Sequence, residues 1–303
     1  MLSSIPENYK TYSQIVADKV LKIMDNDDRV TAITPAMISG SCMNNMFAKY
    51  PKRCFDVGIA EDHAITFACG MALEGLRPFV SVYSSFLQRA YDQLNHDVCR
   101  MNLPVVIGVD RCSIIGEDGD SHQGVFDISY MNSLPNMLIA EGKNSSQIEA
   151  LLDLAFSQTS PFAIRYPRGS IEYNCDQKCE VALGKWEFVV NNIDSKVSII
   201  TYGNDVCKIE KDINDNHLPY NLINALFIKP IDEEMLVSIG KLNKPIVVYT
   251  NDIIKGGLGD SILECLNKIH INAPVYILGV DDIYVKHGSV LKVKESLGLD
   301  LNS

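Results

Sequence analysis

Residues 56–68, Asp-Val-Gly-Ile-Ala-Glu-Asp-His-Ala-Ile-Thr-Phe-Ala, place two carboxyl side chains where a short apolar strand turns into a helix. The segment Cys54–Ala60 is too short and too β-branched for a helix, Gly58 permits a sharp exit, and apolar residues then recur at helical spacing. Glu61 and Asp62 therefore begin the expected helix. Acidic first turns are common because they complement the positive end of a helix, so spacing alone favours a structural role.

Apolar, β-rich segments alternate with helical patterns along the whole chain. This alternation predicts an α/β protein with mostly parallel sheets flanked by helices. We expect two domains, residues 1–172 and 181–303, with the polar stretch 170–180 as the linker. The expected strands are 30–35, 54–60, 78–85, 104–110, 137–142 and 162–167 in the first domain, and 198–203, 221–228, 245–251 and 273–280 in the second.

Composition narrows the class of protein. With 303 residues, 47% hydrophobic and 21% charged, the chain can bury a substantial core. Its formal charge of -11 argues against binding to nucleic acid or to an anionic membrane, since both require a basic patch. No apolar run approaches the roughly eighteen residues of a membrane span, and the first ten residues do not form a signal peptide. We therefore expect a cytoplasmic protein.

The nine cysteines are scattered, which is typical of reduced core residues. Cys175 and Cys179 are close together but lack a matching second pair of ligands, so the spacing favours a plain linker over a metal site.

Three further stretches change the interpretation of Glu61. They are residues 75–93, which include Phe-Leu-Gln-Arg-Ala-Tyr-Asp-Gln at 86–93, the pair Asp110-Arg111, and the loop Asp-Gly-Asp-Ser-His-Gln-Gly at 118–124. Together they resemble the 1-deoxy-D-xylulose-5-phosphate synthases, thiamine-diphosphate enzymes of the transketolase superfamily. The likeness runs from about Tyr12 to Leu299. Transketolases in general share the Gly-Ile-Ala-Glu core, whereas the 118–124 loop is similar to the synthases in particular.

The resemblance implies an incomplete architecture. Full-length members begin with a domain that binds the cofactor diphosphate through Mg²⁺, using a Gly-Asp-Gly followed further along by Asn, and this sequence has no such arrangement. We therefore expect the carboxyl-terminal half of the enzyme, either a natural separate subunit or a piece of a longer chain. A separate diphosphate-binding subunit and a homodimer are the implied partners, and activity without the missing half is not expected.

The resemblance also assigns residues to the cofactor. Glu61 matches the acid that hydrogen-bonds the aminopyrimidine ring and drives its shift to the imino form. Phe86 matches the aromatic residue that stacks on the pyrimidine, although its place on an apolar helical stripe equally fits a core residue. Tyr83 and Arg89 lie close by in sequence, and His63 is retained as a possible cofactor-side residue.

Arginines at strand ends are the expected phosphate ligands. Arg111 follows the segment 104–110 and Arg168 follows 162–167, where parallel strands end and such folds place ligands. The planar guanidinium suits a phosphate, and both arginines, together with Tyr83, match positions that bind the substrate in the family. Asp118 and His122 match positions that handle the acceptor and the substrate protons.

The sequence also departs from the family. Asp62 stands where close relatives often have Gln, and Thr250-Asn251 stand where a pair of glutamates usually precedes the turn Lys255–Gly259. That turn opens a helix and could expose amides to a phosphate, but its spacing fits no known phosphate loop. The pair His287-Gly288 resembles a family motif without an evident physical role.

The expected function is the synthase reaction. It decarboxylates pyruvate and joins the two-carbon unit to glyceraldehyde 3-phosphate, in isoprenoid-precursor and thiamine biosynthesis, with thiamine diphosphate and Mg²⁺ as cofactors. Two alternatives stay open, a subunit of a split transketolase and a noncatalytic paralogue that binds a small molecule or a partner. The presence of all six residues of the matched set argues against a decayed site: Glu61, Phe86, Arg111, Asp118, His122 and Arg168.

Overall fold

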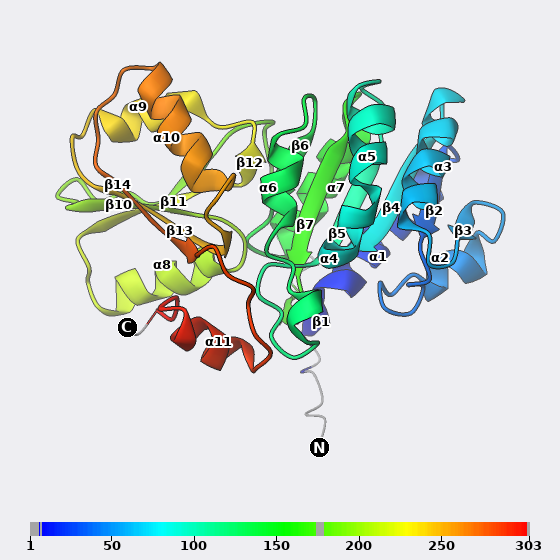
Figure 1. The fold of residues 1–303 in the computed structure, drawn as a ribbon, viewed down its shortest axis with the longest axis horizontal. Coiled ribbons are helices and arrows are strands. Elements are labelled where there is room, and N and C mark those ends of the chain that lie inside the picture. The colour runs from blue at the N-terminus through cyan, green and yellow to red at the C-terminus, as the bar shows by residue number, and fades with distance from the viewer. Residues whose placement is uncertain (1–5, 7, 174–178, 302–303) are drawn as a thin grey trace.

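Two sheets stand side by side in the computed structural model, which describes residues 6, 8–173 and 179–301 (Figure 1). The first sheet has seven strands in the order β12-β6-β7-β5-β4-β2-β3, and all its pairs are parallel except β12–β6. Its strands are β2 (Val30–Thr34), β3 (Cys54–Asp56), β4 (Arg77–Tyr83), β5 (Val106–Cys112), β6 (Leu138–Glu141), β7 (Phe162–Pro167) and β12 (Phe227–Lys229). The expected parallel sheet is confirmed.

Helices cover both faces of the first sheet. Thr11 accepts a hydrogen bond from the Gln14 amide and so caps α1, and Asn144 caps α7 in the same way. The contacts group α1, α2 and α7 in one layer and α3, α6 and the helical run 84–99 in the other. The helices are α1 (Tyr12–Asn26), α2 (Asn44–Lys49), α3 (Glu61–Leu73), α6 (Asp127–Asn132) and α7 (Ser145–Ser157).

The helical run 84–99 changes its pitch along its length. It consists of α4 (Ser84–Leu87), the 3₁₀ turn η1 (Gln88–Ala90), α5 (Tyr91–Gln93) and the π turn η2 (Leu94–Cys99). The apolar residues of this run recur every four positions. In an α-helix, side chains four positions apart are rotated by about 40° relative to each other around the helix axis. A wider π turn reduces this rotation, and Ala90, Leu94 and Val98 are all buried.

The second sheet has five strands in the order β14-β13-β10-β11-β9, parallel except for β9. In Figure 1, α9 and α10 lie on one side of this sheet and α8 on the other. Its elements are β9 (Glu187–Val190), β10 (Val197–Thr201), α8 (Asp205–Asp215), β11 (Tyr220–Asn224), α9 (Glu233–Gly240), β13 (Ile246–Ile253), α10 (Leu258–Lys268), β14 (Val275–Val280) and α11 (Val290–Ser296).

Several expected segment boundaries are wrong. The strands expected at 54–60 and 78–85 end earlier, at Asp56 and Tyr83, and α4 begins at Ser84. Two further differences change the topology. The expected single strand 221–228 divides at Ala225, because the Ala225 amide donates to Thr201 in the second sheet while Leu226 accepts from Glu141 in the first. Its carboxyl-terminal part therefore becomes β12, which joins the first sheet. The expected linker 170–180 also begins as a strand, β8 (Ser170–Glu172), paired antiparallel with β1 (Tyr9–Thr11). Cys175 lies outside the described residues.

Candidate active site

A cavity of about 480 Å³ opens at the carboxyl ends of the first sheet's strands, where parallel sheets place ligands. The turn after β2, the turn before α3, the end of β4 and the run 84–99 form its walls. The lining residues are Pro35, Ala36, Met37, Gly40, Ile59, Glu61, Tyr83, Phe86 and Arg89. The structure thus brings together four side chains that the sequence assigns to the cofactor.

Glu61 is the first residue of α3 and is 4% exposed. Its Oε2 atom accepts no hydrogen bond from any residue the structure describes. The Arg89 Nη1 atom lies 3.2 Å away, close enough for an ion pair but outside hydrogen-bond geometry. A buried carboxyl oxygen that accepts no hydrogen bond is costly unless a ligand completes it, so this position suits a ligand that donates a hydrogen bond to Oε2.

Two aromatic side chains, Tyr83 and Phe86, line the same cavity as Glu61 and form its aromatic wall. The ring centres of Tyr83 and Phe86 lie 5.6 Å apart in a stacked arrangement, and the His122 ring meets Phe86 edge-on at 5.2 Å. Phe86 is only partly buried, so part of its ring remains available to a flat ligand.

Arg111 and Arg168 converge on one carboxylate. The Arg111 Nη1 atom donates to Asp118 Oδ2 at 2.7 Å, and Arg168 Nη1 donates to Asp118 Oδ1 at 3.0 Å. The Arg111 guanidinium also lies over the Tyr83 ring, 4.1 Å from its centre. Two arginines that share one anionic partner form a suitable cradle for a phosphate, and this cradle adjoins the aromatic wall.

The loop that carries Asp118 and His122 is held by hydrogen bonds within the loop and by the segment before α11. The Gln123 side chain accepts hydrogen bonds from the amides of Ile115 and Gly116, at 2.9 and 3.2 Å. The Gly288 amide donates to the Gly116 carbonyl at 3.2 Å. The His287-Gly288 motif therefore has a physical role, because its glycine docks the segment before α11 onto this loop.

Other candidates lie elsewhere. His63 is exposed, and its ring stacks on Phe67 with centres 5.8 Å apart. It does not line the cavity, and Asp62 is likewise exposed. In the turn Lys255–Gly259, the Gly256 amide donates a hydrogen bond to the Asp260 carboxylate at 2.7 Å. That amide is therefore already hydrogen-bonded and does not point free toward a phosphate.

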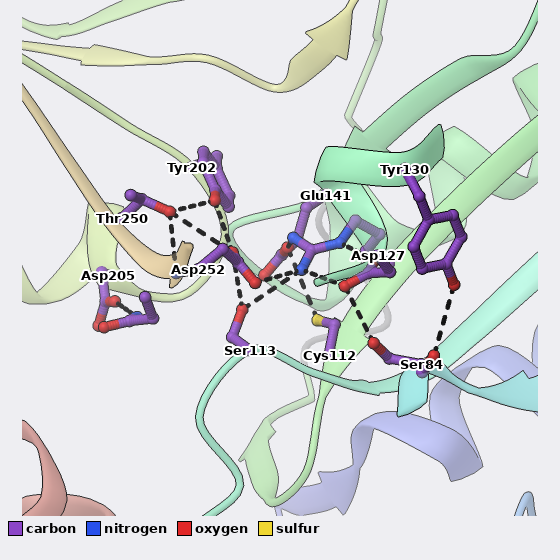
Figure 2. Close-up of polar contacts among 12 residues, drawn as sticks. Ser84, Cys112, Ser113, Asp127, Tyr130, Glu141, Tyr202, Asp205, Thr250 and Asp252 are labelled. Atoms are coloured by element: carbon purple, nitrogen blue, oxygen red, sulfur yellow. Dashed lines mark hydrogen bonds and ion pairs between the residues drawn. The ribbon is translucent and has the colours of Figure 1, made fainter. Parts of the chain in front are cut away.

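Sequence reasoning missed a fully buried charge cluster that spans both sheets (Figure 2). We call Arg165, Asp127, Glu141 and Asp252 the Arg165 cluster. Arg165 lies in β7 and pairs with Asp127 at 2.6 Å, Glu141 at 2.5 Å and Asp252 at 2.8 Å. The only signal in the sequence is an arginine inside an otherwise apolar strand segment, 162–167, and a buried arginine of this kind requires carboxylate partners.

Asp110 is a further buried carboxylate, which the sequence analysis quoted in the pair Asp110-Arg111 without giving it a role. It lies in β5 opposite Tyr83, and Ser13 donates to its Oδ2 atom at 2.8 Å. Its Oδ1 atom has no hydrogen-bond partner among the described residues. Burial raises the pKa of Asp110 to about 7, and burial likewise raises the pKa of Glu141 to about 7.

Comparison with known protein families matches almost the whole chain. Residues 8–173 match the family described as "Transketolase, pyrimidine binding domain", and residues 184–303 match "Transketolase, C-terminal domain". Curated relatives include the 1-deoxy-D-xylulose-5-phosphate synthases of Clostridium tetani, 45% identical, and Listeria monocytogenes, 42% identical. The alignments cover 96% and 95% of this chain but only 47% and 48% of the relatives, so the chain spans about half of their length.

Solved structures share the fold. One of them, "Split gene transketolase, inactive beta4 tetramer", superposes with a TM-score of 0.81 at 25% identity, covering 95% of this chain and 93% of that one. A Pichia stipitis transketolase in complex with sedoheptulose-7-phosphate gives a TM-score of 0.78 at 13% identity, covering 97% of this chain and 44% of that one. The second likeness concerns the fold alone.

Neither a metal cluster nor a membrane span occurs within the described parts of the chain. No group of three or more His, Cys, Asp and Glu side chains there could hold a metal ion. Of the helices in the same ranges, none combines the length and the apolar character needed to cross a membrane.

Proposed function

The chain belongs to the transketolase family, and we propose that it carries the pyrimidine-binding and C-terminal domains, residues 1–172 and 181–303, of a thiamine-diphosphate-dependent 1-deoxy-D-xylulose-5-phosphate synthase. In this proposal pyruvate loses carbon dioxide and its remaining two-carbon unit is joined to glyceraldehyde 3-phosphate. We assign the reaction to isoprenoid-precursor and thiamine biosynthesis in the cytoplasm.

The observation that carries the proposal is the buried Oε2 atom of Glu61, which accepts no hydrogen bond from the described residues and lines a cavity with an aromatic wall. An aminopyrimidine fits this arrangement, because its flat ring can stack on Phe86 while a ring nitrogen completes the hydrogen bonding of Glu61. The residues of this chain thus fit the pyrimidine end of the cofactor.

Each residue of the cavity has a distinct role in this proposal. When bound, thiamine diphosphate supplies a carbon nucleophile that adds to the donor's carbonyl group. Glu61 holds a proton between its Oε2 atom and the pyrimidine ring, which favours the basic form of the cofactor's amino group. Tyr83 and Phe86 fix the plane of the ring and exclude water, and Arg89 closes the cavity beside Glu61.

The cradle formed by Arg111 and Arg168 is the proposed site of the acceptor phosphate. Asp118 holds the two guanidinium groups together and so orients their free N–H groups. His122 contacts Phe86 edge-on, which places its ring between the cradle's loop and the cofactor cavity. We propose that it exchanges a proton with the substrate oxygen there.

The proposal includes partners beyond this chain. A diphosphate-binding domain, on the same or another polypeptide, would hold the cofactor's diphosphate through Mg²⁺, and the assembled enzyme would contain two copies of each domain. The split-gene transketolase is an inactive tetramer of β chains. We extend that precedent to this chain as support for a separate partner subunit.

Two other functions predict different substrates. A split transketolase would transfer a two-carbon unit from a ketose phosphate and release no carbon dioxide, and the split-gene neighbour favours that reaction. A noncatalytic paralogue would bind a ligand at Glu61 without turnover, and it gives no reason for the pair of arginines beside the cavity, Arg111 and Arg168, that suits a phosphorylated substrate. The higher identity to the synthases favours the synthase reaction.

A reconstitution assay tests these functions together. The chain is mixed with a diphosphate-binding partner, thiamine diphosphate and Mg²⁺, and carbon dioxide release from pyruvate is measured with and without glyceraldehyde 3-phosphate. We expect release that depends on both chains, with product formed only when the aldehyde is present. Turnover of ketose phosphates without pyruvate would instead establish the transketolase reaction, and no turnover of either donor would favour the paralogue.

A further inference from the structure

Asp252, labelled in Figure 2, lies in β13 of the second sheet. Its carboxylate nevertheless belongs to the Arg165 cluster, whose arginine lies in β7 of the first sheet. Its Oδ1 atom accepts a hydrogen bond from Arg165 Nη2 at 2.8 Å. Tyr202, also from the second sheet's domain, donates to Asp252 Oδ2 at 2.6 Å. These groups are buried, so their contacts are not screened by water.

The contacts continue from Arg165 to the start of α4. Arg165 donates to both oxygens of Asp127, from Nε at 2.6 Å and from Nη2 at 3.1 Å. The Ser84 hydroxyl donates to Asp127 Oδ1 at 2.9 Å, and Tyr130 donates to the Ser84 carbonyl at 3.5 Å. Ser84 is buried and begins α4 (Figure 2).

The position of Ser84 bears on the cofactor cavity, because two residues close to it in sequence line that cavity. Tyr83 precedes it directly and Phe86 follows two residues later. A change in the position of Ser84 therefore changes the orientation of both rings. A displacement of about 1 Å at a catalytic site can cost a hundredfold in rate.

The Arg165 cluster contains more carboxyl groups than its single arginine can neutralise. One guanidinium faces three buried carboxyl groups, which is an excess of acid. Burial also raises the pKa of Asp252. The carboxylate is thus held against a desolvation cost, whereas a structural role alone would be filled more cheaply by a neutral side chain.

We propose that Asp252 is a positioning residue through which the second sheet's domain sets the aromatic wall of the cofactor cavity, by a path of contacts that ends at Ser84. This inference rests on the proposed function for its catalytic consequence. The path itself is a property of the folded chain and can be tested without any cofactor.

The first experiment measures amide hydrogen exchange in the whole chain by mass spectrometry. Asp252→Asn keeps the shape of the side chain but removes its charge. We expect exchange in residues 84–93 to rise at least fivefold, while α1 exchanges as in the wild type. Asp281→Asn, an exposed change in the same domain, is the matched control and should leave both segments unchanged. Unchanged exchange in residues 84–93 of the Asp252 variant would overturn the proposal.

Two further variants separate the path from its surroundings. Ser113 donates to Asp252 at 3.1 Å and accepts a longer hydrogen bond, 3.5 Å, from Arg165. Ser113→Ala removes both contacts but leaves the contacts from Asp252 through Arg165 and Asp127 to Ser84 in place, so we expect exchange in residues 84–93 to rise less than twofold. Ser84→Ala removes the end of the path, so adding Asp252→Asn to it should produce no further rise in exchange. Independent, multiplying effects of Ser84→Ala and Asp252→Asn would contradict a shared path.

A milder variant covers the case in which Asp252→Asn does not fold. Tyr202→Phe removes one hydroxyl that donates to Asp252, and it should raise exchange in residues 84–93 at least twofold. The absence of any rise in a folded Tyr202→Phe protein would then overturn the proposal.

The second experiment uses the reconstituted enzyme. Asp252→Asn should lower kcat at least fivefold with phosphorylated and unphosphorylated aldehydes alike, while the KM of the phosphorylated aldehyde stays within twofold of the wild type. A rise in that KM without a fall in kcat would assign Asp252 to the phosphate cradle instead. Should reconstitution show no synthase activity at all, the exchange experiment still decides whether the path exists, so the two failures are distinguishable.

Discussion

The guanidinium of Arg111 lies 4.1 Å from the centre of the Tyr83 ring. Tyr83 lines the cofactor cavity, and Arg111 belongs to the cradle proposed for the acceptor phosphate. A single aromatic ring therefore separates the two proposed subsites. This arrangement suits a reaction in which a carbon unit held at the cofactor must reach the aldehyde of a phosphorylated acceptor, because both partners are fixed against the same rigid side chain.

Glu61→Ala should abolish turnover of the reconstituted enzyme while the chain stays folded. The substitution removes a positioned acid, which typically costs about a hundred- to ten-thousand-fold in rate. Ala is well tolerated in a helix, so the free energy of unfolding should change little. Steady-state kinetics and urea unfolding measure the two effects.

Asp62→Asn provides the matched control for Glu61. Asp62 occupies the same first turn of α3 but is exposed. Its substitution should leave kcat nearly unchanged. Similar kinetic losses in both variants would show that the carboxylates act only through the helix end, as the spacing alone suggested.

Gly116→Ala should destabilise the loop that carries Asp118. Gly116 has φ of +83°, and an added Cβ would lie 2.6 Å from the Gly288 carbonyl oxygen. Gly119 has φ of +93° but no atom within 4 Å of an added Cβ. Both variants incur backbone strain, whereas only the first also forces the segment before α11 away. We expect Gly116→Ala to lower the free energy of unfolding by about 1–3 kcal/mol more than Gly119→Ala.

Urea unfolding of the two glycine variants decides this prediction. The loss of stability in the Gly116 variant should be accompanied by a higher KM for the phosphorylated acceptor, because the loop that Gly116 anchors carries Asp118, the carboxylate of the cradle. Equal stability losses in both variants would mean that the contact with Gly288 does not constrain the loop.

The parallel sheet could be predicted because it depends on local patterns, and so could the grouping of Glu61, Tyr83, Phe86 and Arg89 around one cavity. The helix 61–73 follows from apolar spacing, and Glu61 and Phe86 were assigned from motifs that a single segment carries. The Arg165 cluster could not be found in that way, since its members come from four separate elements and meet only after folding. The division at Ala225 was missed for the same reason: each half of the expected strand is apolar, and only tertiary contacts decide which sheet it joins.

Asp110 should make the chain more stable at mildly acidic than at alkaline pH. Burial raises the pKa of Asp110 to about 7 in the folded chain, whereas an unfolded Asp titrates near its usual 3.8. Between these values the folded state binds more protons than the unfolded state, so stability falls as pH rises and the full loss is present above pH 7. The difference between the two pKa values corresponds to a loss of at most about 4 kcal/mol in the free energy of unfolding.

Asp110→Asn tests this assignment because a neutral amide has no charge to bury. We expect the variant to be more stable than the wild type at pH 8 and to show a shallower rise in stability on acidification to pH 5. Part of the rise should remain, because burial raises the pKa of Glu141 into the same range. Asp153→Asn, an exposed change, should leave the wild-type slope intact. An unaltered slope in the Asp110 variant would show that this carboxyl group stays charged throughout.

The last prediction separates the acceptor subsite from the donor subsite. A hydrogen bond to a charged group contributes about 1.5–3 kcal/mol, and about 1.36 kcal/mol corresponds to a tenfold change. Arg168→Ala should therefore lower kcat/KM for glyceraldehyde 3-phosphate by about ten- to a hundredfold. Pyruvate carries no phosphate, so its decarboxylation should be spared, and an unphosphorylated aldehyde should be used as well as by the wild type.

Arg111→Ala should show the same loss together with a second, smaller effect. Of the two cradle arginines, Arg111 is the one that lies over the Tyr83 ring, and a cation–π contact contributes about 0.5–2 kcal/mol. The Arg111 variant should therefore slow pyruvate decarboxylation several-fold, whereas the Arg168 variant should not. Arg29→Ala, which removes an exposed arginine paired with Asp27, controls for the loss of positive charge. Equal losses with phosphorylated and unphosphorylated aldehydes in both cradle variants would assign these arginines to packing, because a phosphate ligand must distinguish the two acceptors.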